Sequence, residues 1–428
     1  MLSNVSEPLL GLVDTMVIGQ LGEEGLIGAI SIGAIIFSFL FWAFGFLRLS
    51  TAGFVAQANG ARDQVEISAV LVRAMAIAFV IGLLILACQG WSRTLAFWWF
   101  SLQPSLEQQA TVYYDIRIWS APAAMVTYVV LGWLVGMQKT VYVMILQLTL
   151  NGTNIILDIV FVTWFGWAVE GVAYATLIAQ WVTLVLSLVL AYRLMPKVQL
   201  TKALLLNRDK FVVLLKANIN IMLRTLCLIF AFADFSRQSE KLGVQVLDAN
   251  SVLLHFTSLS AYALDGFAHA AEGLCGAAIG EKNKTKLRDA FYKTSLWCGV
   301  FSLLIALGFW AGGPLIIDSL TTNAAIRETA RSYLLWAVLM SPLAFASFQL
   351  DGLFFAATRG AEIRNAMIVS LTAYLTAVWF LLPVFGNHGL WISLAIFMVV
   401  RAATLAFYYP RIEASISDAP SDGASDKA

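Results

Sequence analysis

The sequence predicts an all-α integral membrane protein with twelve transmembrane helices in two six-helix lobes related by a parallel repeat. Three observations predict this fold: an apolar composition, twelve apolar stretches of span length, and residues that recur at one offset. Hydrophobic residues are 60% of the 428 and charged residues 12%, against roughly 25% charged in soluble domains. Mean hydropathy is +0.80. A soluble fold of this length has no interior large enough to hide that apolar surface.

About 20 predominantly apolar residues cross a bilayer as a helix. By that measure we expect spans near 1–20, 26–48, 69–98, 113–137, 141–164, 169–193, 218–236, 247–278, 291–317, 333–356, 365–385 and 388–409. The formal net charge is only +1, so the composition gives no reason to expect a nucleic-acid partner. The lipid bilayer is the expected surrounding.

Basic residues predict the orientation, because short cytoplasmic loops collect Lys and Arg. The loops after the second, fourth, sixth, eighth and tenth spans carry basic residues, whereas those after the first, third and fifth carry none. Four residues after the seventh and ninth spans are exceptions: Arg237, Lys241, Arg327 and Arg331. Both termini are therefore expected in the cytoplasm.

Several residues recur at an offset of 220: Asp14 and Asp234, Gly60 and Gly280, Pro122 and Pro342, Gly132 and Gly352. Each half has an even number of spans, so the repeat is parallel, about an axis along the membrane normal. We expect an N-lobe over 1–193, a basic cytoplasmic linker over 194–217, a C-lobe over 218–412 and a disordered cytoplasmic tail over 413–428.

Charges inside the spans are candidates for function, because an ionised carboxylate at the bilayer centre costs at least roughly 2.5 kcal/mol. The acids within expected spans are Glu7, Asp14, Asp158, Asp234, Asp265, Glu272 and Asp351. Four arginines, Arg48, Arg73, Arg117 and Arg224, lie near expected span ends. For these, snorkelling of the guanidinium to the headgroups is the favoured interpretation.

Asn154 and Asp158 are four residues apart, so they share one helix face and offer adjacent oxygen ligands. Such oxygens suit Na⁺ or a proton site. A hydrogen-bond clamp between helices explains the spacing equally well, and both readings stay open. Glu7 and Asp14 are two turns apart and lie on a similar face. A carboxylate buried there would take a proton near neutral pH, as a proton-coupled carrier requires.

A second polar stripe is predicted in the eighth span, where Asp265 and Glu272 are two turns apart and His269 is one turn from Asp265. We interpret these three residues, with Asp351 of the tenth span, as cavity or substrate-lining residues. No phosphate-binding loop, zinc-protease motif or nucleophile elbow occurs. The sequence therefore gives no support for an enzyme or for a bound cofactor.

Four segments carry a resemblance to a known family: residues 8–19 (PLLGLVDTMVIG), 46–53 (FLRLSTAG), 154–158 (NIILD) and 262–267 (YALDGF). They resemble the MATE (multidrug and toxic compound extrusion) family, in particular its DinF-like branch. The resemblance implies a bacterial inner-membrane monomer that exchanges small organic compounds for H⁺ or Na⁺. It also implies a cation site, for a proton or Na⁺, at four residues: Asp14, Asn154, Asp158 and Thr176.

Two departures from the family pattern affect the first span. Relatives begin earlier, with a proline in the first half of that span, so the first span is expected to be short here. Glu7 stands where relatives carry a neutral residue. Its charge would repel an ionised Asp14 and so favour protonation of Asp14, which makes Glu7 an expected modulator of the cation site.

The leading hypothesis is a secondary active exporter that works by alternating access of its two lobes. A lipid-linked oligosaccharide flippase of the same superfamily is an alternative, which an arginine-rich cavity would favour. A membrane scaffold without transport is a third, which the expensive buried acids disfavour.

Overall fold

The computed structural model describes residues 26–100, 104–199, 201, 205, 207–321 and 323–416, and within them it contains helices and no strand. The all-α prediction is confirmed. The α-helices are α2 Leu26–Ala43, α3 Phe46–Gly60, α4 Gln64–Ala87, α5 Gln89–Phe100, α6 Pro104–Arg117, α7 Ala121–Gly136, α8 Thr140–Ile159, α9 Val169–Leu194, α11 Arg208–Lys241, α12 Val244–Gly280, α13 Lys284–Leu320, α14 Ala324–Ala356, α15 Gly360–Phe385 and α16 Asn387–Ala414. A short 3₁₀-helix, η1 (Ile118–Ser120), separates α6 from α7.

Ten helical segments in the described residues are long and apolar enough to cross a membrane. The expected eighth span forms α12, which has the length but carries too many polar residues to be among those ten. The expected first span lies outside the described residues, as does most of the expected tail. The remaining ten expected spans correspond to the ten segments, so the chain is a multi-pass membrane protein.

Several span boundaries differ from the sequence-based expectation. The second span was expected to end at residue 48, but α3 continues to Gly60. The third is divided, with α4 ending at Ala87 and α5 starting at Gln89. α11 begins at Arg208, inside the stretch expected to be the linker. Hydropathy detects only the apolar middle of a helix, whereas backbone hydrogen bonding continues into polar ends that reach the headgroups and water.

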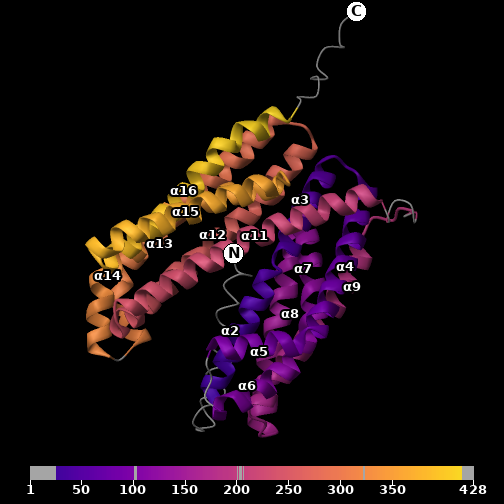
Figure 1. The fold of residues 1–428 in the computed structure, drawn as a ribbon. Helices are drawn as coiled ribbons and strands as arrows, with labels where there is room; N and C mark the ends of the chain where they lie inside the picture. The colour runs from indigo at the N-terminus through magenta and orange to yellow at the C-terminus, as the bar shows by residue number, and fades with distance from the viewer. Residues whose placement is uncertain are drawn as a thin grey trace, which may run out of the picture. The chain divides into compact units, whose positions relative to one another are not determined.

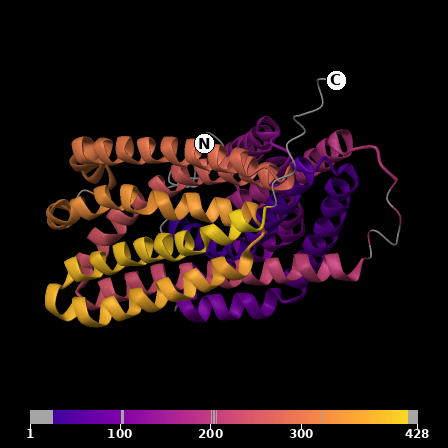
Figure 2. The same cartoon turned by 90° about the horizontal axis from the view of Figure 1, so that it is seen from above.

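The chain divides into two compact units. We call Leu2–Val55 with Asp63–Leu214 the N-unit, and Ala56–Arg62 with Leu215–Ala428 the C-unit. In Figure 1 the N-unit helices run from indigo to magenta, and the C-unit helices from rose to yellow apart from the indigo end of α3. Within the C-unit, α13 packs on α14 and α16 packs on both α14 and α15, so these helices lie side by side in Figures 1 and 2.

The repeat is visible in the tight turns between helices. Four non-glycine residues of the described chain have positive φ angles, and they form two pairs at the offset of 220: Arg62 (55°) with Lys282 (55°), and Gln138 (60°) with Thr358 (54°). The helices after the first pair of turns start with matching caps. Asp63 accepts from the Glu66 N–H at 2.9 Å, and Asn283 accepts from the Lys286 N–H at 2.8 Å. Equivalent turns at equivalent positions confirm the internal repeat at an offset of 220.

Glycines at equivalent positions allow close helix crossing in each half. A Cβ on Gly132 of α7 would lie 2.2 Å from the Arg48 carbonyl oxygen of α3. A Cβ on Gly352 of α14 would lie 2.4 Å from the Ala268 oxygen of α12. Small residues at such crossings let membrane helices pack backbone to backbone. The two recurring glycines therefore allow equivalent contacts in the two halves: α7 with α3, and α14 with α12.

The end of α3 crosses the end of α12 through a reciprocal glycine contact inside the C-unit. A Cβ on Gly60 would lie 1.9 Å from the Ala277 oxygen, and a Cβ on Gly280 would lie 1.9 Å from the Gln57 oxygen. The Gln57 side-chain amide also donates to the Ala356 carbonyl at 2.7 Å. The atoms that an added Cβ would meet belong to the backbone. Neither Gly60 nor Gly280 can therefore be replaced by a larger residue unless the two helices move apart.

Gly60→Ala is therefore expected to destabilise the protein by about 1–3 kcal/mol through overpacking. Gly308→Ala in α13 is the matched control, because nothing lies within 4 Å of the added Cβ. There the change removes backbone freedom from the unfolded chain and gains up to about 1 kcal/mol. Thermal unfolding of the two purified variants should shift in opposite directions, and equal shifts would show that α3 does not approach α12 so closely.

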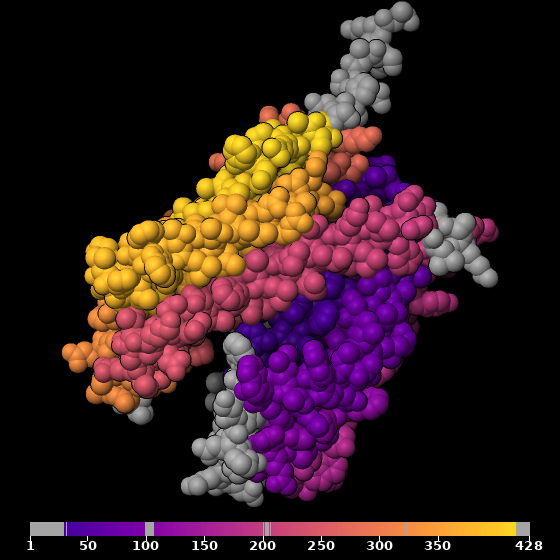
Figure 3. Space-filling view, viewed as in Figure 1, coloured from indigo at the N-terminus to yellow at the C-terminus, as the bar shows by residue number. Residues whose placement is uncertain are grey.

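The outer faces of the helices are apolar. In the view of Figure 3 the C-unit surface is formed by α11, α15 and α16, and these helices expose large hydrophobic side chains such as Phe230, Trp379 and Phe407. An apolar exterior around a partly polar interior is the arrangement expected of a protein surrounded by hydrocarbon.

Candidate functional site

α8 has its polar side facing inward. Its buried residues are Leu146 and four polar ones, Gln147, Asn151, Asn154 and Asp158, which follow one another at intervals of three or four residues. Its exposed residues include Val141, Ile145, Leu148 and Ile156. This distribution is the reverse of a soluble amphipathic helix. α8 therefore supplies a polar wall inside the N-unit and an apolar face to the lipid.

The described members of the predicted cation site all lie on this wall or on the neighbouring helix α9. Asn154 is 1% exposed, Asp158 0% and Thr176 3%. The Asn154 side-chain nitrogen donates to the Thr176 hydroxyl at 3.1 Å, and that hydroxyl donates to the Val172 carbonyl at 3.1 Å. Asp158 lies one turn along α8 from Asn154. Asp14, the fourth predicted ligand, lies outside the described residues, as does Glu7.

The two readings of the Asn154 spacing turn out to be compatible. The amide nitrogen of Asn154 forms the clamp between α8 and α9, which leaves its carbonyl oxygen, Oδ1, buried and without a hydrogen-bond partner in the described part of the chain. A buried acceptor of this kind carries a desolvation cost of about 1–3 kcal/mol. A cation or a protonated group at Oδ1 removes that cost. One side chain can thus hold two helices together and coordinate an ion.

A π-helical turn, η2 (Val160–Trp164), follows directly after α8 and begins two residues after Asp158. Such turns shift the register of a helix by one residue and are frequent at functional sites. Here the register changes within two residues of the fully buried carboxylate, at the end of α8.

The predicted lining residues of the second half lie on α12 and α14. Glu272 is 1% exposed and Asp351 3%, whereas Asp265 and His269 are half-buried. The His269 ring nitrogen Nδ1 lies 3.4 Å from the Glu272 carboxylate. A polar interior is therefore present in the C-unit as well as in the N-unit.

Asp351 forms a buried ion-pair cluster with two arginines from other helices. Arg401 of α16 donates to both carboxylate oxygens, from Nε to Oδ1 at 3.3 Å and from Nη2 to Oδ2. Arg224 of α11 donates to the same Oδ2. The favoured interpretation of Arg224 as a snorkelling side chain is wrong, because the residue is 9% exposed and its guanidinium meets a carboxylate inside the unit.

Sequence reasoning missed Arg401. The signal was present, since Arg401 is a charge within the apolar run of the last expected span. Arg73 also departs from the snorkelling interpretation: it is 3% exposed and pairs with Glu66 at 2.6 Å within α4.

Asp234, the repeat counterpart of Asp14, is also inside its unit. It is 8% exposed, and it accepts from the Tyr374 hydroxyl at 3.3 Å and from the Gln238 amide at 3.1 Å. The C-unit thus holds its acids in hydrogen-bonded or ion-paired surroundings.

Comparison with known proteins decides the family. The MatE family model matches residues 1–160 and 221–381. The "DNA damage-inducible protein F" of Escherichia coli is 35% identical over 411 residues, which cover 96% of this chain and 89% of that protein. The chain belongs to the MatE family. The two matched segments start 220 residues apart, which is the offset of the internal repeat.

Further similarities are consistent with the assignment of this chain to the MatE family. "Protein DETOXIFICATION 44, chloroplastic" of Arabidopsis thaliana is 22% identical over 424 residues, covering 94% of this chain and 78% of that one. Two solved structures share the fold. The "Outward-facing conformation of a multidrug resistance MATE family transporter of the MOP superfamily" gives a TM-score of 0.87 at 21% identity, covering 96% and 93% of the two chains. The "Crystal structure of MATE in the straight conformation" gives 0.86 at 22% identity, covering 97% and 94%.

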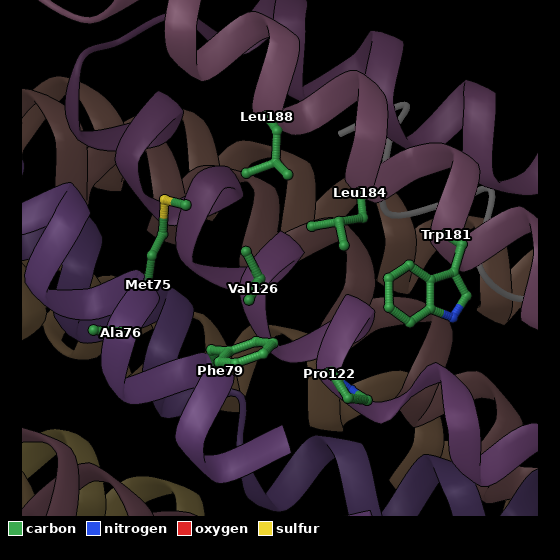
Figure 4. Close-up of a pocket in the computed structure, with 8 residues that line it drawn as sticks. All are labelled: Met75, Ala76, Phe79, Pro122, Val126, Trp181, Leu184 and Leu188. Carbon is green, nitrogen blue, oxygen red and sulfur yellow. The ribbon is translucent and has the colours of Figure 1, made fainter. Parts of the chain in front are cut away.

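The N-unit of this MatE-family chain also carries an apolar groove of about 320 Å³. Figure 4 shows its lining, which comes from α4, α7 and α9: Met75, Ala76, Phe79, Pro122, Val126, Trp181, Leu184 and Leu188. Phe79 and Trp181 are exposed, so the groove opens on the surface of the unit. It contains none of the predicted site residues and has no charged group to fix a ligand.

Proposed function

We propose that this MatE-family transporter is a secondary active antiporter that exports small organic compounds, often cationic or amphipathic, in exchange for H⁺ or Na⁺. It works by alternating access of its two lobes, as a monomer with both termini in the cytoplasm of a bacterium. The observation that carries the proposal is the fully buried Asp158 beside the unsatisfied Asn154 oxygen, on the inner wall of the N-unit.

The chemistry of this wall suits a transported cation. An ionised carboxylate in hydrocarbon is expensive, and Asp158 lies where little water reaches it. Binding of a proton or Na⁺ between Asp158 and the Asn154 oxygen neutralises the charge and satisfies the acceptor. Asp14 completes the proposed site with a second carboxylate. Two carboxylates with amide and hydroxyl oxygens form a hard-ligand set, as Na⁺ requires, and they also bind protons.

Coupling follows from linkage. A cation that binds one state of the transporter more tightly than the other shifts the equilibrium between them by that difference in affinity. If the substrate prefers the opposite state, cation entry on one side of the membrane promotes substrate release there. Antiport needs no covalent step, so it requires none of the catalytic motifs searched for in the sequence.

The names of the relatives support the substrate class. One similar structure is described as a multidrug resistance transporter, and several plant relatives are named for detoxification. The length of the similarity, which covers 96% of this chain in its bacterial relative, supports carrying the small-molecule class over. A flippase of lipid-linked oligosaccharides remains the alternative.

The proposal is tested in proteoliposomes loaded with a lipophilic cationic dye. Dye movement is followed under an imposed pH gradient and then under an imposed Na⁺ gradient. We expect one gradient to drive export and the other to have little effect, which identifies the coupling ion. If neither gradient moves the dye but a fluorescent lipid-linked glycan changes leaflet, the flippase alternative replaces the exporter.

A further inference from the structure

In the ion-pair cluster around Asp351, the guanidinium of Arg224 has fewer hydrogen bonds than that of Arg401. Arg401 and Asp351 form a complete pair, since two nitrogens of one meet two oxygens of the other. This fork-to-fork arrangement is the strongest that Arg and a carboxylate form. Arg224 adds one bond, to an oxygen that Arg401 already uses. Arg224 is therefore an additional cation beside a pair that is complete without it.

Arg224 carries an unsatisfied donor. Its Nε–H is buried and has no hydrogen-bond partner among the residues that the structure describes, in a residue that is 9% exposed. The guanidinium lies over the Phe355 ring, 5.8 Å from its centroid, which offers a weak attraction but no acceptor. A charged donor left unpaired inside a protein is costly, so its presence needs a reason.

Two guanidiniums, those of Arg224 and Arg401, share the single carboxylate of Asp351. Asp265 of α12 attracts Arg401, whereas Arg224 repels it. Arg224 has a single contact with Asp351, at the oxygen that Arg401 also contacts. A second oxyanion beside Arg224 would satisfy Nε–H and screen the repulsion between the two guanidiniums.

Arg224 also lies near an end of the unit. It is one turn from Asn220, whose side-chain oxygen accepts from Arg364 at 2.9 Å. The same asparagine packs against Gly360, directly after the turn between α14 and α15. The basic residues predict that this end faces the cytoplasm, which is the side where an exporter collects its substrate.

From this geometry we infer that Arg224 binds an oxyanion, a carboxylate, sulfonate or phosphate, that an amphipathic molecule presents from the cytoplasmic side. As a substrate contact this rests on the proposed function, and it assigns the acidic group of such a substrate to the Arg224 guanidinium. The same chemistry fits the phosphate of a membrane lipid. The guanidinium fork suits either, because it matches the planar geometry of an oxyanion better than a lysine ammonium does.

The test is equilibrium binding to the purified protein in dodecyl maltoside micelles, which carry no phosphate. No ion gradient is present, so the outcome does not depend on transport. The two ligands are a rhodamine with a free carboxylate and the ethyl ester of the same dye, measured by fluorescence anisotropy. In these micelles we expect the wild type to bind the acid roughly ten-fold more tightly than the ester. Arg224→Gln should remove that preference, and Arg411→Gln, which changes an exposed arginine of α16, should keep it.

Added phosphatidylglycerol separates the two sources of the oxyanion. If the preference persists, the substrate supplies the group; if the anionic lipid abolishes it in the wild type, the lipid phosphate occupies Arg224. Equal wild-type affinities for acid and ester in these phosphate-free micelles would overturn the inference without reference to any variant. An unchanged preference in folded Arg224→Gln would also overturn it.

Discussion

Asp158→Asn is expected to lower gradient-driven export by roughly 10- to 100-fold. The change keeps the shape of the side chain but removes the charge that we propose holds the cation, and a hydrogen bond or contact to a charged group contributes about 1.5–3 kcal/mol. Each 1.4 kcal/mol is a factor of ten in affinity. The rate of dye export from proteoliposomes measures the effect, at an ion gradient that saturates the wild type.

The matched control for Asp158 is Asp289→Asn, which makes the same chemical change at an exposed carboxylate paired only with Lys293 on its own helix in the described structure. It should export at the wild-type rate. If Asp158→Asn folds and exports as well as this control, the N-unit wall is a structural clamp and not the coupling site.

Asp351→Leu is expected to destabilise the protein by about 3–5 kcal/mol, the cost of removing one partner from a buried ion pair. Arg224 and Arg401 would then face each other without a carboxylate between them. The triple variant Asp351→Leu, Arg224→Met, Arg401→Met should recover most of the loss, because a buried ion cluster replaced by apolar residues is often neutral or stabilising. Thermal unfolding of the purified proteins, followed by tryptophan fluorescence, measures both.

The triple variant tests whether the loss of stability in Asp351→Leu comes from unpaired buried arginines or from any change to this region. A triple variant less stable than Asp351→Leu alone would mean that the two arginines stabilise the fold by contacts other than the carboxylate. A single variant with wild-type stability would mean that the cluster is solvated.

Much of the fold could be predicted because each helix that crosses the hydrocarbon core needs about 20 predominantly apolar residues. Apolar length located the spans, and the offset between Gly132 and Gly352 located the repeat, since a close crossing accepts only a small residue at both positions. Helix ends such as Gly60 and Arg208 could not be predicted in the same way. Their positions depend on turn geometry and on backbone bonding beyond the apolar stretch.

The site was predicted less completely, for a different reason. Spacing along one helix places Asn154 beside Asp158, but partners from different helices depend on packing that periodicity does not encode. Thr176 came only from the family resemblance, and the structure places it in contact with Asn154. The approach of Arg224 and Arg401 to Asp351 joins residues 127 and 50 positions apart. No local pattern indicates such a meeting.

The central claim, that substrate and cation exchange for one another, is tested most directly by running the coupling backwards. Proteoliposomes with no imposed ion gradient receive a substrate gradient, and cation movement is followed with a pH-sensitive or Na⁺-sensitive dye in the lumen. Because coupling is reciprocal, substrate moving one way should drive the coupling ion the other way in the wild type and not in Asp158→Asn. Substrate movement without any countermovement of H⁺ or Na⁺ would contradict antiport.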